Sequence, residues 1–153
     1  MRKSLIIGLL VLAGACHRTT TIETAPSSSR TSGESGASPR SALADFLGAV
    51  KAQDLQAMSL AWGDKNGPVR DSKSMSRQEM EQREVLLMRC FRHDAYRVVS
   101  ELPGLDGERQ MQVELARGTN KKVTDFFLAK GEGRWYVRSA SLDPVREVCS
   151  AKG

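Results

Sequence analysis

Few residues of this chain are suited to holding a metal ion or a nucleotide. Its 153 residues include two histidines and three cysteines, and none of them stands at HxxxH or CxxC spacing. Such spacings bring metal ligands onto one helix face or into one turn. The chain also has no GxSxG, Walker or GxGxxG segment, and so no nucleophile elbow and no glycine-rich phosphate loop. We therefore predict no metal site, no catalytic motif and no cofactor.

The positive charge of the chain is small and scattered. The sequence has 23 basic and 18 acidic residues, a formal net charge of +5. Removal of Arg2 and Lys3 with a leader peptide lowers the excess to +3, and the longest basic run is Lys121-Lys122. A nucleic-acid-binding domain normally gathers such charge into a patch or stripe. We therefore predict no nucleic-acid partner.

The first fifteen residues have the order of a secretory signal. Arg2 and Lys3 form a positive start, residues 5–12 form an apolar core, and small residues lead to Cys16. This order is typical of a signal peptide. The apolar stretch 5–15 has eleven residues, whereas a membrane-spanning helix needs about 20. We therefore predict a cleaved signal peptide over residues 1–15.

Residues 12–16, Leu-Ala-Gly-Ala-Cys, resemble a bacterial lipobox, although Leu12 lies one position before the commonest place for leucine. In a lipobox the cysteine thiol receives diacylglycerol. The same segment also suits ordinary signal peptidase, but a merely secreted protein has no reason to begin with Cys16. The resemblance implies lipidation of Cys16 and anchoring in membrane lipid. Because His17 rather than Asp follows, the Gram-negative sorting rule implies the outer membrane, facing the periplasm.

Residues 16–40 are expected to form a disordered tether behind the anchor. Of the 24 residues from 17 to 40, 17 are Ser, Thr, Gly, Pro or Ala, and Ile22 is the only large apolar one. Such a stretch buries too little surface to offset the entropy lost on ordering. A flexible spacer and a leader remnant of no required length both fit this composition.

Residues 41–153 are long enough for one modest domain, and its first half has helical periodicity. Leu43, Phe46, Leu47 and Val50 recur at helical spacing behind a Ser41 cap. Asp54 is suited to cap a second, short helix, and residues 64–74 are expected to form a loop. Ser76 and Glu79 form a capping box for a third helix. Two sets of side chains are expected on that helix: a core stripe of Met80, Leu87, Met88 and Phe91, and a solvated face of Glu81, Arg83, Glu84 and Arg89.

The second half alternates with the period of strands. Strands are expected at 96–99, 111–115, 123–129 and 135–142, with short turns between them. Short turns favour antiparallel pairing, because parallel strands need a crossover of a dozen or more residues. The fold class is therefore predicted as α+β, with helices packed on a curved antiparallel meander.

The order and lengths of these elements resemble the nuclear transport factor 2-like, or cystatin-like, superfamily. The segment 133–142, Gly-Arg-Trp-Tyr-Val-Arg-Ser-Ala-Ser-Leu, is similar to the glycine–tryptophan last strand common in that superfamily. The resemblance covers residues 41 to about 149. It implies a cone-like sheet whose concave face binds a small ligand or a partner protein of the cell envelope.

If Cys16 is acylated, Cys90 and Cys149 remain as an even pair in an oxidising compartment. We expect them to form a disulfide. The alternative is two separate buried thiols that pack as small apolar side chains.

Three functions remain open from the sequence. The first is a non-catalytic domain that binds a ligand or a partner, and the second is a protein of envelope assembly or self-protection. The third is an enzyme like a ketosteroid isomerase or a dehydratase, whose pocket carboxylate acts as base. Its candidate residues are Asp125 with Tyr96 or Tyr136, and Asp94 beside His93. We favour the first, and expect Asp125 to be exposed or paired with a Lys or Arg.

Overall fold

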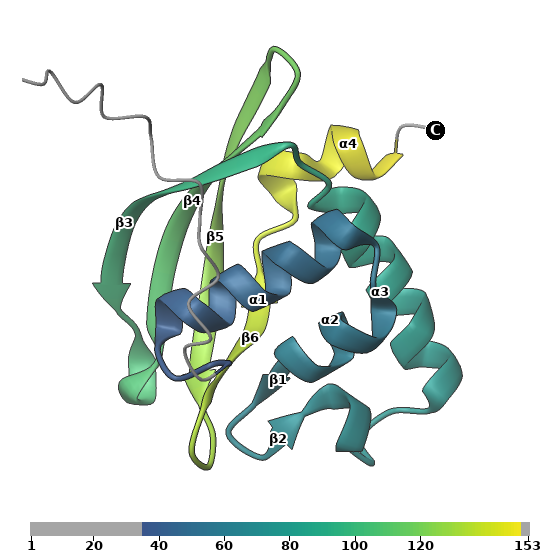
Figure 1. Ribbon diagram of the computed structural model, residues 1–153, viewed down its shortest axis with the longest axis vertical. Helices are drawn as coiled ribbons and strands as arrows, with labels where there is room; N and C mark the ends of the chain where they lie inside the picture. Colours follow the sequence, from purple (N-terminus) through teal and green to yellow (C-terminus); the bar gives the residue numbers. More distant parts are fainter. Residues whose placement is uncertain (1–34, 151–153) are drawn as a thin grey trace, which may run out of the picture. The chain divides into compact units, whose positions relative to one another are not determined.

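The computed structural model describes residues 35–150. These residues form helices that lie on one side of a four-stranded antiparallel sheet of order β3-β4-β5-β6 (Figure 1). In chain order, the helices and strands are α1 (Pro39–Ala52), α2 (Leu55–Ala61), β1 (Gly63–Asp64), β2 (Gly67–Pro68), α3 (Arg77–Cys90), β3 (Ala95–Pro103), β4 (Arg109–Arg117), β5 (Asn120–Lys130), β6 (Trp135–Ala140) and α4 (Arg146–Ser150), with short 3-10 turns η1 (Val69–Asp71), η2 (Leu105–Gly107) and η3 (Asp143–Val145). The predicted α+β fold with a meander sheet is confirmed. None of the helices within residues 35–150 is long and apolar enough to cross a membrane.

The first helix begins earlier than the sequence predicted. Ser38, not Ser41, is the N-cap of α1: its hydroxyl accepts from the Ser41 amide, while the Ser41 hydroxyl accepts from the Ser38 amide. Pro39 then occupies the first helical position, where its missing N–H costs nothing. The preceding Gly36 carbonyl accepts from the Trp135 amide at 2.7 Å. The end of the segment assigned to the tether therefore contacts the domain.

The other two predicted caps are confirmed. The Asp54 carboxylate accepts from the Ala57 amide at the start of α2. Ser76 and Glu79 form the reciprocal capping box of α3, which satisfies two amides that have no partner within the helix. Local side chains therefore set the starts of both helices.

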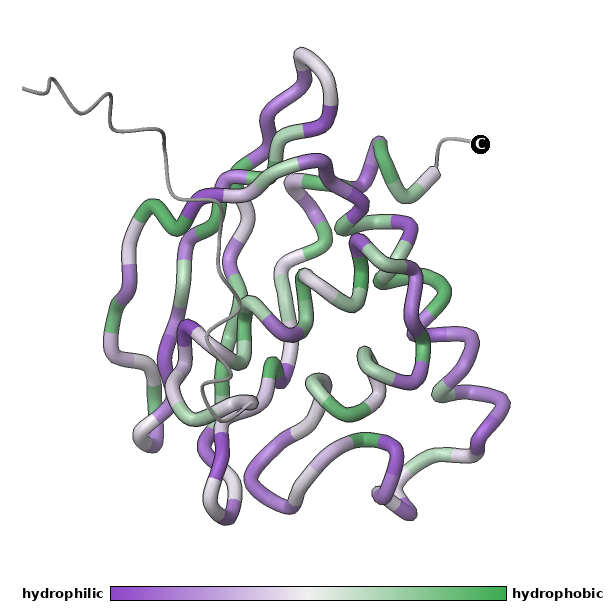
Figure 2. Tube along the Cα trace, viewed as in Figure 1, coloured by the Kyte–Doolittle hydropathy of each residue, from purple (hydrophilic) through white to green (hydrophobic). Residues whose placement is uncertain are grey.

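The strands are amphipathic, and hydrophilic and hydrophobic residues alternate along them (Figure 2). On β5, Thr124, Phe126 and Leu128 are buried on the side that faces the helices, so Asp125 and its neighbours two positions away face outward. The pairing of Gln112 with Asp125 continues this outer face onto β4. The sequence left the inner face of β5 undecided, and the helices decide it.

Three phenylalanines fill the space between the helices and the sheet. Phe46 of α1, Phe91 at the end of α3 and Phe126 of β5 have ring centroids 5.0 to 6.5 Å apart, in edge or tilted arrangements. All three side chains are at most 1% exposed. Such pairs contribute about 0.5–1.5 kcal/mol each beyond the area that they bury. The space between the helices and the sheet is therefore packed core.

The predicted loop at 64–74 contains a small hairpin formed by β1 and β2. Trp62 joins this hairpin to the sheet: it bridges Val137 in parallel, and its indole nitrogen donates to the Arg138 carbonyl at 3.2 Å. Gly63 then lies against the Tyr136 ring, where a Cβ would come within 2.9 Å of a ring carbon. A larger residue at Gly63 would displace the hairpin.

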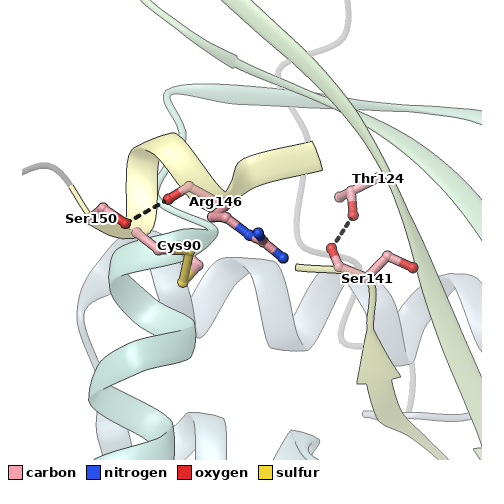
Figure 3. Close-up of a disulfide and its surroundings, with 6 residues drawn as sticks. Cys90, Thr124, Ser141, Arg146 and Ser150 are labelled. Atoms are coloured by element: carbon pink, nitrogen blue, oxygen red, sulfur yellow. Dashed lines mark hydrogen bonds between the residues drawn. A yellow bond between two sulfur atoms is a disulfide. The ribbon is translucent and has the colours of Figure 1, made fainter. Parts of the chain in front are cut away.

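Cys90 and Cys149 form the predicted disulfide, with their Cα atoms 4.3 Å apart. The bond joins the end of α3 to α4 (Figure 3). A helix of five residues is too short to be stable alone, and α4 has no fully buried residue of its own. The disulfide therefore holds α4 against the domain.

Glu84 corrects the prediction of a fully solvated face on α3. Its side chain is buried, with 2% exposure, whereas Val85 and Leu86 are 47% and 42% exposed. The Oε1 atom of Glu84 has no hydrogen-bond partner within residues 35–150. Burial, and secondarily the charge of Glu81, raises the pKa of Glu84 from 4.5 to about 7. A buried carboxyl without a partner favours the protonated form.

Replacing Cys149 with Ala should lower the free energy of unfolding by about 4 kcal/mol, the chain-entropy value for a loop of this length. Urea unfolding measures the loss, and amide exchange should show that α4 loses protection first. Reduced wild-type protein should match the variant, which separates the lost bond from the lost sulfur atom. An unchanged unfolding midpoint in both samples would show that α4 is held by other contacts.

Glu84→Gln should remove a pH dependence of stability. The folded-state pKa is raised, so folded protein binds the proton more tightly and the free energy of unfolding falls as pH rises from about 4.5 to about 7. Above pH 7 the variant should be more stable than wild type by on the order of 2 kcal/mol, and near pH 4 the two should agree. Glu132→Gln, an exposed acid that lies outside the surroundings of Glu84, is the control. Parallel stability profiles for wild type and Glu84→Gln would refute this assignment.

Candidate functional site

The main candidate site is a groove of about 470 Å³ between the β4–β5 hairpin and α4. The hairpin projects past the helices at this end of the sheet, and α4 lies near its base (Figure 1). We call this hollow the disulfide groove, because Cys90 forms part of its wall. Its lining residues are Cys90, Arg92, Leu115, Arg117, Gly118, Asn120, Lys122, Val145, Glu147 and Val148.

The floor of the disulfide groove is apolar and fixed. Cys90, Leu115 and Val145 are at most 5% exposed. Val145 is held in η3 just after Ser141, whose carbonyl accepts from the Thr124 hydroxyl at 2.6 Å (Figure 3). A hydrogen bond at one end and a disulfide at the other therefore position this wall of the groove.

Strand register places the polar side chains on the helix side of the sheet. Lys122 pairs with the buried Leu115, and Asn120 pairs with Arg117 two positions along. Side chains two residues apart share a face of a strand. Lys122 and Arg117 therefore project from the inner face, at the end of the sheet that the helices leave uncovered.

Three cations surround the floor of the groove. Arg92 and Arg117 are exposed and form no salt bridge within residues 35–150. Lys122 contacts Glu147 at 3.1 Å, an exposed pair that contributes little to stability. The remaining nearby acid, Asp94, accepts from the Gly118 amide at 2.8 Å and closes the turn. The charges around the disulfide groove therefore favour an anionic ligand, and its apolar floor favours one with an apolar part.

The residues proposed for an isomerase-like site are not brought together. Tyr96 pairs with Leu115 and so lies on the inner face of the edge strand β3, with 38% exposure. Asp125 faces outward on β5, half-buried, and its Oδ1 has no partner within the described residues. It was expected to be exposed or paired with a Lys or Arg, and it is neither. Tyr136 of β6 is buried beside Gly63, and the Cζ atom of Arg134 lies 5.1 Å from the centroid of the Tyr136 ring.

The ring of His93 is hydrogen-bonded to the backbone. Its Nδ1 donates to the Phe91 carbonyl at 2.8 Å, and its ring lies 5.7 Å from that of Tyr96. Burial is the main cause that lowers the pKa of His93, so the neutral ring is favoured. Asp94 turns away to the Gly118 amide. The two residues therefore shape the start of the sheet and do not form an acid–base pair.

A second hollow of about 460 Å³ lies between α2, η1 and α3, and Glu84 is one of its lining residues. The sequence prediction placed Glu84 on the solvated face of α3, although the spacing of Glu84 from its apolar neighbours indicated otherwise. Met80, Glu84, Leu87 and Phe91 follow each other at steps of four, three and four residues, so all four lie on one helix face. A charged residue inside an apolar stripe predicts a buried charge.

Neither a cluster of metal ligands among the described residues nor a similar known protein identifies the chemistry of these two hollows. Within residues 35–150, no three His, Cys, Asp or Glu side chains lie close enough to hold a metal ion. The predicted lipidation site Cys16 and the signal peptide lie outside the described residues. Comparison of the chain with protein-family models, with curated proteins and with solved structures gives no match.

Proposed function

We propose that this protein is an exported, lipid-anchored envelope protein whose domain binds a small anionic ligand in the disulfide groove without catalysis. The signal segment and Cys16 support export and anchoring. The Cys90–Cys149 bond supports the same address, because stable disulfides form mainly outside the cytosol. The anchor then keeps the domain at the membrane surface, with the outer membrane as the proposed location.

The observation that carries the binding proposal is the combination of charge and apolar floor. Three cations, Arg92, Arg117 and Lys122, border a floor that is apolar and positioned by a covalent bond. A carboxylate or phosphate group would be held by the guanidinium groups through charge-assisted hydrogen bonds. An attached alkyl or aryl body would bury the floor. The volume falls within the range of ordinary small-ligand pockets.

The proposal retains the resemblance to the nuclear transport factor 2-like superfamily for the scaffold. Helices on the concave side of a meander, with a hairpin joined to the last strand through Trp62, support this resemblance. Because Phe46, Phe91 and Phe126 fill the space between the helices and the sheet, we propose the ligand site at the end of the sheet that the helices leave uncovered.

Binding without reaction fits the groove better than catalysis. The side chains that line it include no hydroxyl, imidazole or free thiol, and their one carboxylate, Glu147, contacts Lys122 at 3.1 Å. General acid–base catalysis needs a group of matched pKa within hydrogen-bond reach of the substrate. Arginine and lysine hold charge in place but do not exchange protons readily near neutral pH.

Octanoate should bind the domain more tightly than octanol, because only octanoate carries the charge that the groove favours. Arg117→Gln should weaken octanoate binding about fivefold to tenfold, an estimate for one partly exposed charged contact. Calorimetry or chemical-shift titration measures both. Lys130→Gln, which removes an exposed cation outside the groove, is the matched control.

Two results would contradict the groove assignment: equal affinity for octanoate and octanol, or an unchanged affinity in Arg117→Gln. Raising the salt concentration should weaken octanoate binding, because exposed charges are screened. Tighter binding of an acidic peptide than of octanoate would instead assign the groove to an envelope partner protein.

Intact-mass analysis of the membrane-extracted protein should show a chain that begins at Cys16 and carries added acyl mass. Each buried methylene contributes about 0.8 kcal/mol to membrane binding, so several acyl chains make the anchor stable. Cys16→Ser should move the protein from the membrane to the soluble fraction. A soluble wild-type product with an unmodified Cys16 would refute the lipid anchor and would still be compatible with export.

A further inference from the structure

We propose that the hollow between α2 and α3 is a second binding site, for a compact organic amine whose N–H group donates to the Glu84 carboxylate. This site is separate from the disulfide groove and does not depend on its function. We call it the Glu84 pocket. Its lining residues are Leu55, Gln56, Ser59, Arg70, Ser72, Met75, Arg77, Met80, Glu81, Glu84 and Val85.

The first reason is that the described part of the chain supplies no hydrogen-bond donor to the Oε1 atom of Glu84. The Oε1 atom is screened from solvent and has no partner among the described residues. Leaving such an oxygen unsatisfied costs about 1–3 kcal/mol, more when it is charged. The buried hydroxyl of Ser59, which also lines the hollow, donates to the Gln56 carbonyl at 2.9 Å instead. A ligand that donates to this carboxylate, which lines the hollow, supplies the donor that the surrounding side chains lack.

The second reason is that no Lys, Arg or His within residues 35–150 forms a salt bridge with Glu84. Arg70 of η1 contacts Asp71 at 3.1 Å, and Arg77 of α3 contacts Glu81 at 2.9 Å. The remaining charged residue of the lining is Glu81 itself, which repels a negative charge on Glu84. The lining residues that come from α2 carry no charge. A positive ligand therefore meets an uncompensated carboxylate.

The third reason is the apolar part of the lining, which sets the ligand class. Leu55, Met75, Met80 and Val85 border the Glu84 pocket, and Val85 is nearly half exposed. A ligand that carried only charge would leave these side chains in water. A primary or secondary amine with a short alkyl or aryl group would contact both the carboxylate and the apolar side chains.

Glu84 also makes amine binding depend on pH. Burial and Glu81 raise the pKa of Glu84 to about 7, so the carboxylate form dominates only above neutral pH. Simple amines remain protonated well above that value. The attraction between ammonium and carboxylate should therefore strengthen as pH rises from 6 to 8. The other charged side chains of the lining, Arg70, Arg77 and Glu81, and Asp71, which pairs with Arg70, belong to η1 and α3.

Benzylamine and benzyl alcohol are suitable probes, since they differ in the charged donor and share the aryl body. At pH 8 the wild type should bind benzylamine about tenfold to a hundredfold more tightly than benzyl alcohol, the range of one charge-assisted hydrogen bond. Glu84→Gln should abolish this preference and retain the weak binding of the alcohol. Glu132→Gln, an exposed acid outside the pocket, should behave as wild type. Titration followed by NMR chemical shifts measures each affinity and locates each probe.

Several results would overturn the proposal. They are no preference for benzylamine at pH 8, an unchanged preference in Glu84→Gln, or an affinity that does not fall between pH 8 and pH 6. Loss of the preference in Glu81→Gln alone would assign the ammonium group to the exposed carboxylate. Chemical-shift changes by benzylamine that are confined to the disulfide groove would also refute the Glu84 pocket. Such a result would not bear on the octanoate experiment, which tests the disulfide groove separately.

Discussion

The packing of α1 and the end of α3 onto the inner face of the sheet is the contact on which the rest of this domain depends. Phe46, Phe91 and Phe126 meet between the two layers and exclude water completely. Once Phe126 faces inward, period-two geometry turns Asp125 outward. The same contact fixes the C-terminal end of α3, because Phe91 is the next residue after Cys90 in the chain. Both candidate sites follow from this arrangement.

The disulfide groove exists because the sheet is longer than the helix layer. The β4–β5 hairpin carries Arg117 and Lys122 beyond the helices, and α4 returns beside its base (Figure 1). A short final helix has little to hold it, since its own hydrogen bonds are few. Cys149 supplies the missing constraint, and Val145 inserts into the core just before it. The covalent bond therefore builds one wall of a site.

The two hollows have opposite electrostatic character. Cations border the disulfide groove, whereas an unbalanced carboxyl lies in the Glu84 pocket. Burying Glu84 without a partner costs stability, and an apolar residue at the same position of α3 would remove that cost. Residues that lower stability often belong to functional sites, where the lost stability is offset by binding.

The sequence by itself determined the local and periodic features of this protein. Helix starts at Asp54 and Ser76 depend on side chains within three residues, and the meander depends on short turns between alternating segments. Spacing even held the signal for Glu84, which was missed because a charged helix residue is usually solvated. The start of α1 was misplaced by three residues, since Ser38 and Ser41 both suit a cap and only the reciprocal hydrogen bonds choose between them.

Only the tertiary structure decided which face of β5 is inside, because Phe126 and Phe127 present equal apolar surface on opposite faces. It also decided that Cys90 and Cys149 meet, since their separation of 59 residues leaves their distance open. The cations of the disulfide groove come from the loop after α3, from β4 and from β5, and no motif joins them in the chain. Long-range packing brings such residues together, and the local sequence does not encode where the packed layers end.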